Sequence, residues 1–95
     1  MLEDIQQSEK AHKGAFFILK GGQRLAEMTY SRAGDSLVII DHTEVHDSLR
    51  GSGAGQALVE KAVAWARMTN TRIMPLCPFA RSVFDKNPGL RDVLI

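Results

Sequence analysis

One stretch in the middle of the chain, residues 41–55, limits most strongly what this sequence can fold into. It reads DHTEVHDSLRGSGAG, follows the apolar run LVII at 37–40 and leads into a long amphipathic pattern. This order predicts a strand, a short polar loop and a glycine-rich turn that opens a helix. The N–H groups of such a turn can approach an anion closely, and the helix N-terminus adds partial positive charge. The stretch therefore predicts an anion-binding turn.

Two generic phosphate-binding motifs do not fit this turn. A Walker-type loop needs Lys and then Ser or Thr after its last glycine, whereas Gly55 is followed by Gln56. A dinucleotide-binding fingerprint needs its third glycine where Gln56 stands, and 95 residues are too few for a doubly wound fold. A purely structural glycine turn is the alternative. Arg50, next to the glycines, favours a pyrophosphate ligand.

The composition indicates one small domain that spans residues 1–95, with a hydrophobic content of 44% and a single core. A net charge of +1 favours neither nucleic acid nor an anionic membrane as a partner. The N-terminus has no charged-then-apolar signal pattern, and no apolar run approaches the length of a membrane span. A single cysteine, Cys77, can form neither an internal disulfide nor a metal cluster of its own. We therefore expect a reduced, cytoplasmic protein.

The hydrophobic pattern predicts an α+β fold. We expect strands at 15–20, 24–30, 37–45 and 72–77 and helices at 56–68 and 79–86. The polar residues 1–14 are expected to form a frayed start or a short edge strand. Because the fourth strand follows a helix, it should run parallel to the third through a right-handed crossover. The prediction is a mixed four-stranded sheet in the order β-β-β-α-β-α, with the helices packed against it.

The third predicted strand changes character along its length. Residues 37–40 are apolar on both faces, which predicts a central position in the sheet. Beyond Ile40, simple alternation puts His42 and Glu44 on the same face as Val38, where polar side chains would line a cavity. A β-bulge would have the same effect, since one extra residue re-aims the side chains.

Several motifs together resemble one superfamily. Residues 50–55, RGSGAG, match the R-x-x-G-x-G signature of the GNAT superfamily of acetyl-CoA-dependent N-acetyltransferases, and Val45 precedes the signature as it does there. HTEV at 42–45, PLCPF at 75–79 and NP at 87–88 resemble the small YjdJ-like branch. The resemblance covers about residues 15 to 90. It implies a minimal GNAT fold in which the third and fourth strands splay apart.

The resemblance also implies acetyl-CoA (CoA) as cofactor and an amine as acceptor. The pyrophosphate would bind the N–H groups of the glycine turn, the pantetheine would lie along the third strand, and the thioester would enter between the splayed strands. The implied cofactor-binding residues are Glu44, Val45, Arg50, Gly51, Ser52, Gly53, Ala54 and Gly55. The chain lacks the extra helices and strands that wall the acceptor site in larger members, and it has Asp47 where many carry proline. The acceptor and the oligomeric state stay open.

Acetyl transfer needs a base for the amine and a proton for the leaving thiolate. Glu44 is the first candidate base, and the alternative is that it only orders the strand or the cofactor. The imidazole of His42 suits a proton relay, although a strand histidine is more often structural. Cys77 would protonate the thiolate, accept the acetyl group as a nucleophile, or simply pack in the core. Phe79 is expected in the core rather than against pantetheine. A non-catalytic acyl-CoA-binding module of the same fold is the rival function.

Overall fold

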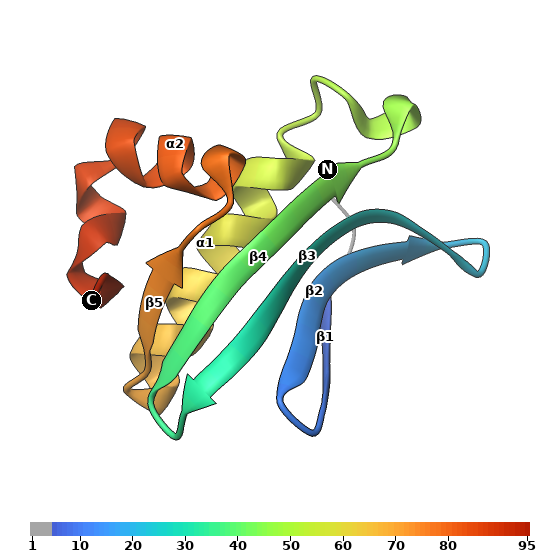
Figure 1. The fold of residues 1–95 in the computed structure, drawn as a ribbon. Helices are drawn as coiled ribbons and strands as arrows, with labels where there is room; N and C mark the ends of the chain where they lie inside the picture. Colours follow the sequence, from blue (N-terminus) through green and yellow to red (C-terminus); the bar gives the residue numbers. More distant parts are fainter. Residues whose placement is uncertain (1–4) are drawn as a thin grey trace.

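A computed structural model describes residues 5–95 and contains one mixed five-stranded sheet (Figure 1). The sheet order is β1-β2-β3-β4-β5, in which the first four strands are antiparallel and β5 is parallel to β4. The strands are β1 (Ile5–Lys10), β2 (Lys13–Lys20), β3 (Gln23–Gly34), β4 (Leu37–Val45) and β5 (Arg72–Pro75). The helices are α1 (Ala54–Thr69) and α2 (Pro78–Lys86), with short 3-10 turns η1 (Asp47–Leu49) and η2 (Pro88–Val93).

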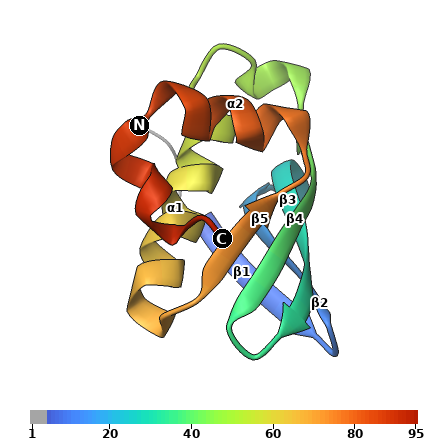
Figure 2. The same cartoon turned by 60° about the vertical axis from the view of Figure 1, so that its left-hand side comes forward.

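Helix α1 covers one face of the sheet and contacts β2, β3 and β4. Figure 2 shows α2 above the end of β5, beside the first turn of α1. The buried stripe of α1 meets the inward side chains of the strands. This core includes Phe16, Ile18, Met28, Tyr30, Ile40, Leu58, Val59, Val63, Ile73 and Phe84. Neither helix of residues 5–95 has the length and apolar character needed to cross a membrane.

The prediction of four strands is wrong, because residues 5–10 form an additional edge strand. The edge-strand interpretation of the N-terminal segment is therefore right for these residues, while residues 1–4 lie outside the described part. The strand was hard to recognise because its inward face is polar. Gln7 Nε2 donates to the Tyr30 hydroxyl at 2.9 Å, and that hydroxyl donates to Glu9 Oε1 at 2.8 Å. Glu9 also forms an ion pair with Arg32 at 2.8 Å.

This polar cluster makes folding stability depend on pH. The hydrogen bond from Arg32, followed by that from Tyr30, lowers the pKa of Glu9 below its usual value of 4.5. A carboxyl with a lowered folded-state pKa stabilises the fold above its unfolded pKa, and this stabilisation is lost as the pH falls through the folded pKa.

We predict that Glu9→Gln lowers the free energy of unfolding at pH 7 and flattens its pH dependence below about pH 4.5, where the unfolded carboxyl begins to titrate. Urea unfolding at a series of pH values measures both effects. The wild-type and variant curves should converge in acid. Parallel curves across this range would show that Glu9 does not carry the pH dependence.

The other predicted elements agree with the structure except at their ends, where the strand predicted at 15–20, for example, begins at Lys13. The strand predicted at 24–30 extends over Gln23–Gly34, and α1 begins at Ala54, two residues before the predicted start. Strand β5 ends at Pro75, so Cys77 is not in the strand but is the N-cap residue of α2. Asn70 ends α1 in the left-handed conformation (φ 55°), which asparagine adopts more readily than most residues.

Candidate active site

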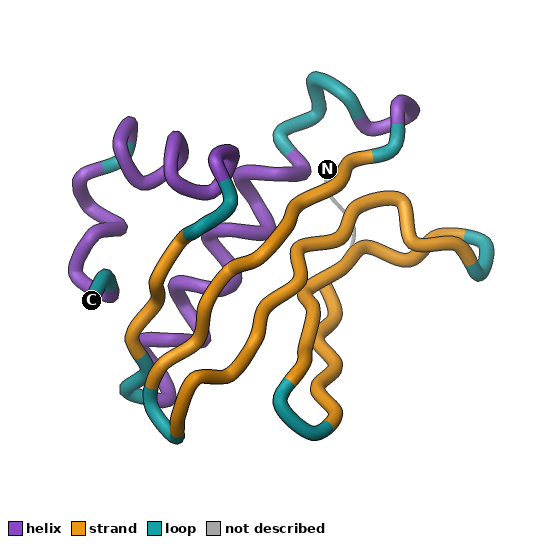
Figure 3. The backbone as a smooth tube through the Cα atoms, viewed as in Figure 1, coloured by secondary structure: helices purple, strands orange, loops and turns teal. Residues whose placement is uncertain are grey.

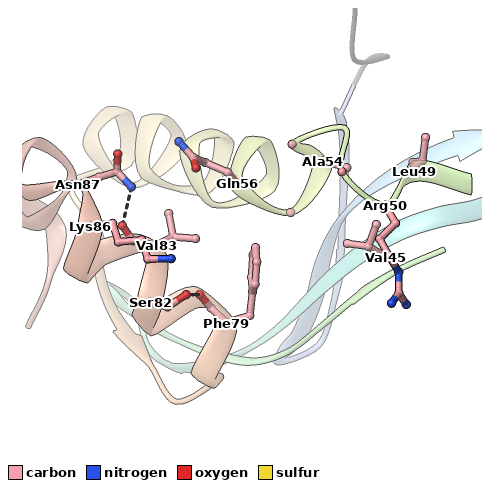
Figure 4. A pocket seen from close by; sticks show the side chains of 13 residues that line it. Val45, Leu49, Arg50, Ala54, Gln56, Phe79, Ser82, Val83, Lys86 and Asn87 are labelled. Atoms are coloured by element: carbon pink, nitrogen blue, oxygen red, sulfur yellow. Dashed lines mark hydrogen bonds between the residues drawn. The ribbon is translucent and has the colours of Figure 1, made fainter. Parts of the chain in front are cut away.

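Two loops meet at one end of the sheet: the β4–α1 connection and the β5–α2 connection (Figure 3). Between them lies a cavity of about 610 Å³, which we call the glycine-loop cleft. One wall is the glycine turn with the first residues of α1, and the other is one side of α2 (Figure 4). It is lined by Val45, Leu49, Arg50, Gly51, Gly53, Ala54, Gly55, Gln56, Phe79, Ser82, Val83, Lys86 and Asn87.

The glycine turn has the backbone of an anion-binding site. Gly51 (φ 81°) and Gly53 (φ 83°) are in the left-handed region, which glycine adopts without steric cost. Gly53 caps α1 without any side-chain bond to the helix. The Ala54 N–H donates to Ser52 Oγ at 3.3 Å, while the N–H groups of Gly55 and Gln56 have no acceptor within residues 5–95. These helix N-terminal donors are suited to an anion.

Gly55 lets the two walls of the cleft pack closely. A Cβ at this position would lie 2.5 Å from Phe79 Cζ, so only glycine allows the ring of α2 to rest on the first turn of α1. Phe79 keeps 41% of its surface exposed and faces the cleft, as Figure 4 shows. The prediction that Phe79 belongs to the core is therefore wrong. The close helix–helix contact holds the ring at the surface of the cleft instead.

Strands β4 and β5 separate beside the cleft. Their pairing ends at Ile40 and Pro75, although β4 continues to Val45. The N–H groups of Leu76 and Cys77 both donate to the Ile40 carbonyl at 3.1 Å, and the chain then turns into α2. Within residues 5–95, the edge of β4 at residues 41–45 consequently has no strand beside it on this side. This is the splay that the resemblance implied.

A bulge decides which side chains face the splay. In the β3–β4 register, His42 pairs with Thr29 but Ile40 pairs with Tyr30, so Asp41 is an extra residue. Thr43 and Val45 consequently lie on the helix-covered face, opposite Met28 and Ala26 of β3. The prediction that His42 and Glu44 continue the face of Val38 is wrong, because the extra residue rotates both side chains to the opposite face.

Thr43 and Cys77 meet across the splay. The Cys77 thiol lies 3.4 Å from Thr43 Oγ1 and is buried. Burial raises the pKa of the thiol, but the hydrogen bond with Thr43 and the polarity of the nearby Ala80 and Phe79 backbone outweigh it, so the pKa lies below the usual value of 9.0. This backbone belongs to the first turn of α2, which Cys77 precedes as N-cap residue without a side-chain hydrogen bond to it. The site therefore favours the thiolate more than an ordinary buried cysteine does.

His42 and Glu44 form a separate pair on the face of the sheet that α1 leaves open. His42 Nε2 lies 3.6 Å from Glu44 Oε2, and both side chains are largely exposed. Glu44 lines a second cavity, of about 480 Å³, together with Glu27 and Arg24. Val45 and Arg50 line both this cavity and the glycine-loop cleft. The two cavities therefore meet at the end of β4, one on each face of the strand.

The predicted cofactor residues divide into three groups. Those that line the cleft are Val45, Arg50, Gly51, Gly53, Ala54 and Gly55. Ser52 does not line it but supports the turn, since its hydroxyl accepts from Ala54 and donates to the Leu49 carbonyl. Glu44 lies in the second cavity instead.

Sequence reasoning missed Thr43 and the α2 wall of the cleft. The possible bulge was the only signal for Thr43. On α2, the lining residues at 79, 82, 83 and 86 have helical spacing. This spacing alone does not distinguish a helix face that lines a cleft from one that packs in the core.

The chain belongs to the GCN5-related N-acetyltransferase family, because the family model matches residues 15–93. A GCN5-like protein of Staphylococcus aureus, solved by NMR, is 33% identical, with a TM-score of 0.72 over 95% of this chain and 87% of that one. No protein of curated function matches the chain.

Two more distant structures share the fold. Ribosomal-protein-alanine N-acetyltransferase of Brucella melitensis biovar Abortus 2308 is 16% identical (TM-score 0.66), with 82% of this chain and 62% of that one covered. Aminoglycoside N-acetyltransferase AAC(6′)-Iy, solved in complex with CoA, is 15% identical (TM-score 0.60), with 87% and 88% covered.

Proposed function

We propose that this protein is an acetyl-CoA-dependent N-acetyltransferase that transfers an acetyl group to an amine. One observation carries the proposal: the glycine turn, Val45 of the splayed β4 edge and Phe79 of α2 line a single cleft. Cys77 does not line this cleft but is buried two residues before Phe79, against Thr43 of the splayed edge. The residues of the cleft fit CoA. The N–H donors at the start of α1 suit a pyrophosphate, and Val45, Phe79 and Val83 offer apolar surface to pantetheine. Membership of the YjdJ-like branch stays a prediction from the sequence motifs.

The unpaired edge of β4 is the surface along which the pantetheine would lie. In the described part of the chain, backbone groups at residues 41–45 are free of a strand partner on the splayed side, so they can hydrogen-bond its amides. Bound acetyl-CoA supplies the activated acetyl group as a thioester. A backbone N–H on this edge is the donor we expect to stabilise the oxyanion that develops on the thioester carbonyl.

Cys77 is suited to give a proton to the departing CoA thiolate. A thiol whose pKa is lowered passes its proton favourably to a thiolate of ordinary pKa. Thr43 and the α2 N-terminus then stabilise the charge that stays on Cys77. The same lowered pKa also suits attack by Cys77 on the acetyl group, which is the alternative for this residue.

The acceptor amine would approach from the open face of the sheet, where Glu44 and His42 are exposed to solvent. A primary amine with a pKa near about 10.4 must lose a proton before it attacks. Glu44 would take this proton as general base, and His42 would relay it to solvent. The rival function is an acyl-CoA-binding module that lacks turnover. The open acceptor side is compatible with this function as well, because a binding module needs no walled acceptor site.

Binding is tested by thermal unfolding with CoA. At a CoA concentration of about 100 Kd, the fold should gain about 2.7 kcal/mol and the Tm should rise by about 10 °C or more. Gly53→Val and Gly22→Val form a matched pair, since the two glycines have φ of 83° and 79° and open space around them. Both variants should lose similar stability, but only Gly53→Val should lose the response to CoA. An unchanged Tm in folded wild type would refute CoA binding.

Turnover is tested separately, by thiol release from acetyl-CoA with a panel of polyamines, lysine peptides and peptide N-termini. We expect release above the buffer rate, matched by acetylated amine in mass spectrometry. Stabilisation by CoA without any release would instead support the binding-module function.

A further inference from the structure

The charged side chains that line the glycine-loop cleft are all cationic. Its 13 lining residues include two cations, Arg50 and Lys86, and no carboxylate. Figure 4 shows the two cations at opposite ends, with Phe79 between them. Because the first turn of α1 already offers N–H donors to one anionic group, a second cationic position at the far end points to a ligand with a second anion.

The two cations differ in their surroundings. Arg50 Nη2 lies 2.9 Å from Asp47 Oδ1, so its charge is partly balanced within its own loop. Lys86 has no ion-pair partner within residues 5–95. Its neighbour Asn87 is not a phosphate ligand of this kind, since its amide donates to the Val83 carbonyl at 2.7 Å and caps the end of α2. Lys86 is therefore the cation on this wall that a ligand can use.

The position of Lys86 in the cleft indicates which anionic group of CoA its ammonium group would contact. Lys86 stands seven residues beyond Phe79 on α2, which corresponds to about 10 Å of helix. It is thus set back from the ring that would contact pantetheine, on the wall opposite the glycine turn. CoA carries one anionic group besides its pyrophosphate, the 3′-phosphate of the ribose, and a phosphate monoester has close to two negative charges at neutral pH.

We propose that Lys86 recognises the 3′-phosphate of CoA and makes the cleft selective for CoA over dephospho-CoA. The inference rests on the proposed function, because it names a specificity residue for the same ligand. It also divides the role of α2: the first turn of the helix would contact the pantetheine, and its last turn would contact the nucleotide.

The test is isothermal titration calorimetry at low salt with CoA and dephospho-CoA, which differ only in the 3′-phosphate. Wild type should bind CoA about tenfold more tightly, as expected for one charge-assisted contact. In Lys86→Gln, the affinity for CoA should fall to that for dephospho-CoA, and the affinity for dephospho-CoA should not change. Lys86→Arg should keep most of the discrimination. Lys61→Gln, the same charge change on the outer side of α1, should keep all of it.

The outcomes separate the two proposals. Equal affinities of wild type for the two ligands, or an equal loss of both in Lys86→Gln, would overturn the role of Lys86 while CoA binding stands. Binding of neither ligand by folded wild type would overturn the proposed function itself. Thermal unfolding without ligand checks that Lys86→Gln folds, since a cation in the last turn of a helix also contributes modestly to its stability.

Discussion

The substitution Gly14→Ala should lower the free energy of unfolding by about 3 kcal/mol, the upper part of the usual range for overpacking. Gly14 lies opposite Tyr30 in the β2–β3 pair, and a Cβ there would lie 2.5 Å from the tyrosine hydroxyl oxygen. Tyr30 is 1% exposed and its ring packs against the rings of Phe16 and Trp65, with centroids 5.6 and 5.8 Å away. Because Gln7 also bonds the hydroxyl, the ring cannot move aside.

Gly34→Ala is the matched control for this prediction. Gly34 is also a strand glycine, but a Cβ there meets nothing within 4 Å and its φ is not in the left-handed region. Its effect should stay within about 0.5 kcal/mol. Urea unfolding measures both values, and the Tm of Gly14→Ala should fall by about 10 °C or more. Similar values for the two variants would show that the Tyr30 contact does not limit this position.

The contrast between these glycines indicates what the sequence could reveal. Gly21 and Gly22 join β2 to β3, and a Gly-Gly pair between two strands indicates a hairpin turn from local φ values alone, which are 59° and 79° here. The requirement for glycine at position 14 comes from contact with Tyr30, which is distant in sequence, so no local sequence pattern predicts this requirement. The sequence leaves β1 open between a frayed start and an edge strand for the same reason, since its inward polar residues satisfy a partner on β3.

In the candidate site, too, the features that depend on local sequence could be predicted, and those that depend on tertiary contacts could not. The glycine turn and the helix that it opens could be predicted, because the glycines and the helix start are consecutive in the sequence. The faces of β4 could not be assigned, because alternation holds only until the extra residue at Asp41, and that bulge arises from pairing with β3. The α2 wall also depends on tertiary structure, since the exposure of Phe79 follows from its contact with Gly55.

The role of Cys77 can be decided by combining two substitutions with the pH dependence of the rate. If Cys77 protonates the leaving thiolate, Cys77→Ala should lower kcat by about 100-fold, the lower end of the usual contribution of general acid catalysis, with little change in KM for acetyl-CoA. Full activity of Cys77→Ala would show that the thiol only packs between β4 and α2.

Thr43→Val then separates the acid from the nucleophile. Loss of the Thr43 hydroxyl removes a hydrogen bond that lowers the pKa of Cys77, so this pKa should rise in the variant. An acid works in its protonated form, below its pKa, so the falling alkaline side of the kcat/KM profile should move to higher pH. A nucleophile works as the thiolate, above its pKa, so the rising side would move instead, and an acetyl adduct on Cys77 would appear in mass spectrometry. We expect the first result, with Thr43→Ser as the control that keeps the hydroxyl and the wild-type profile.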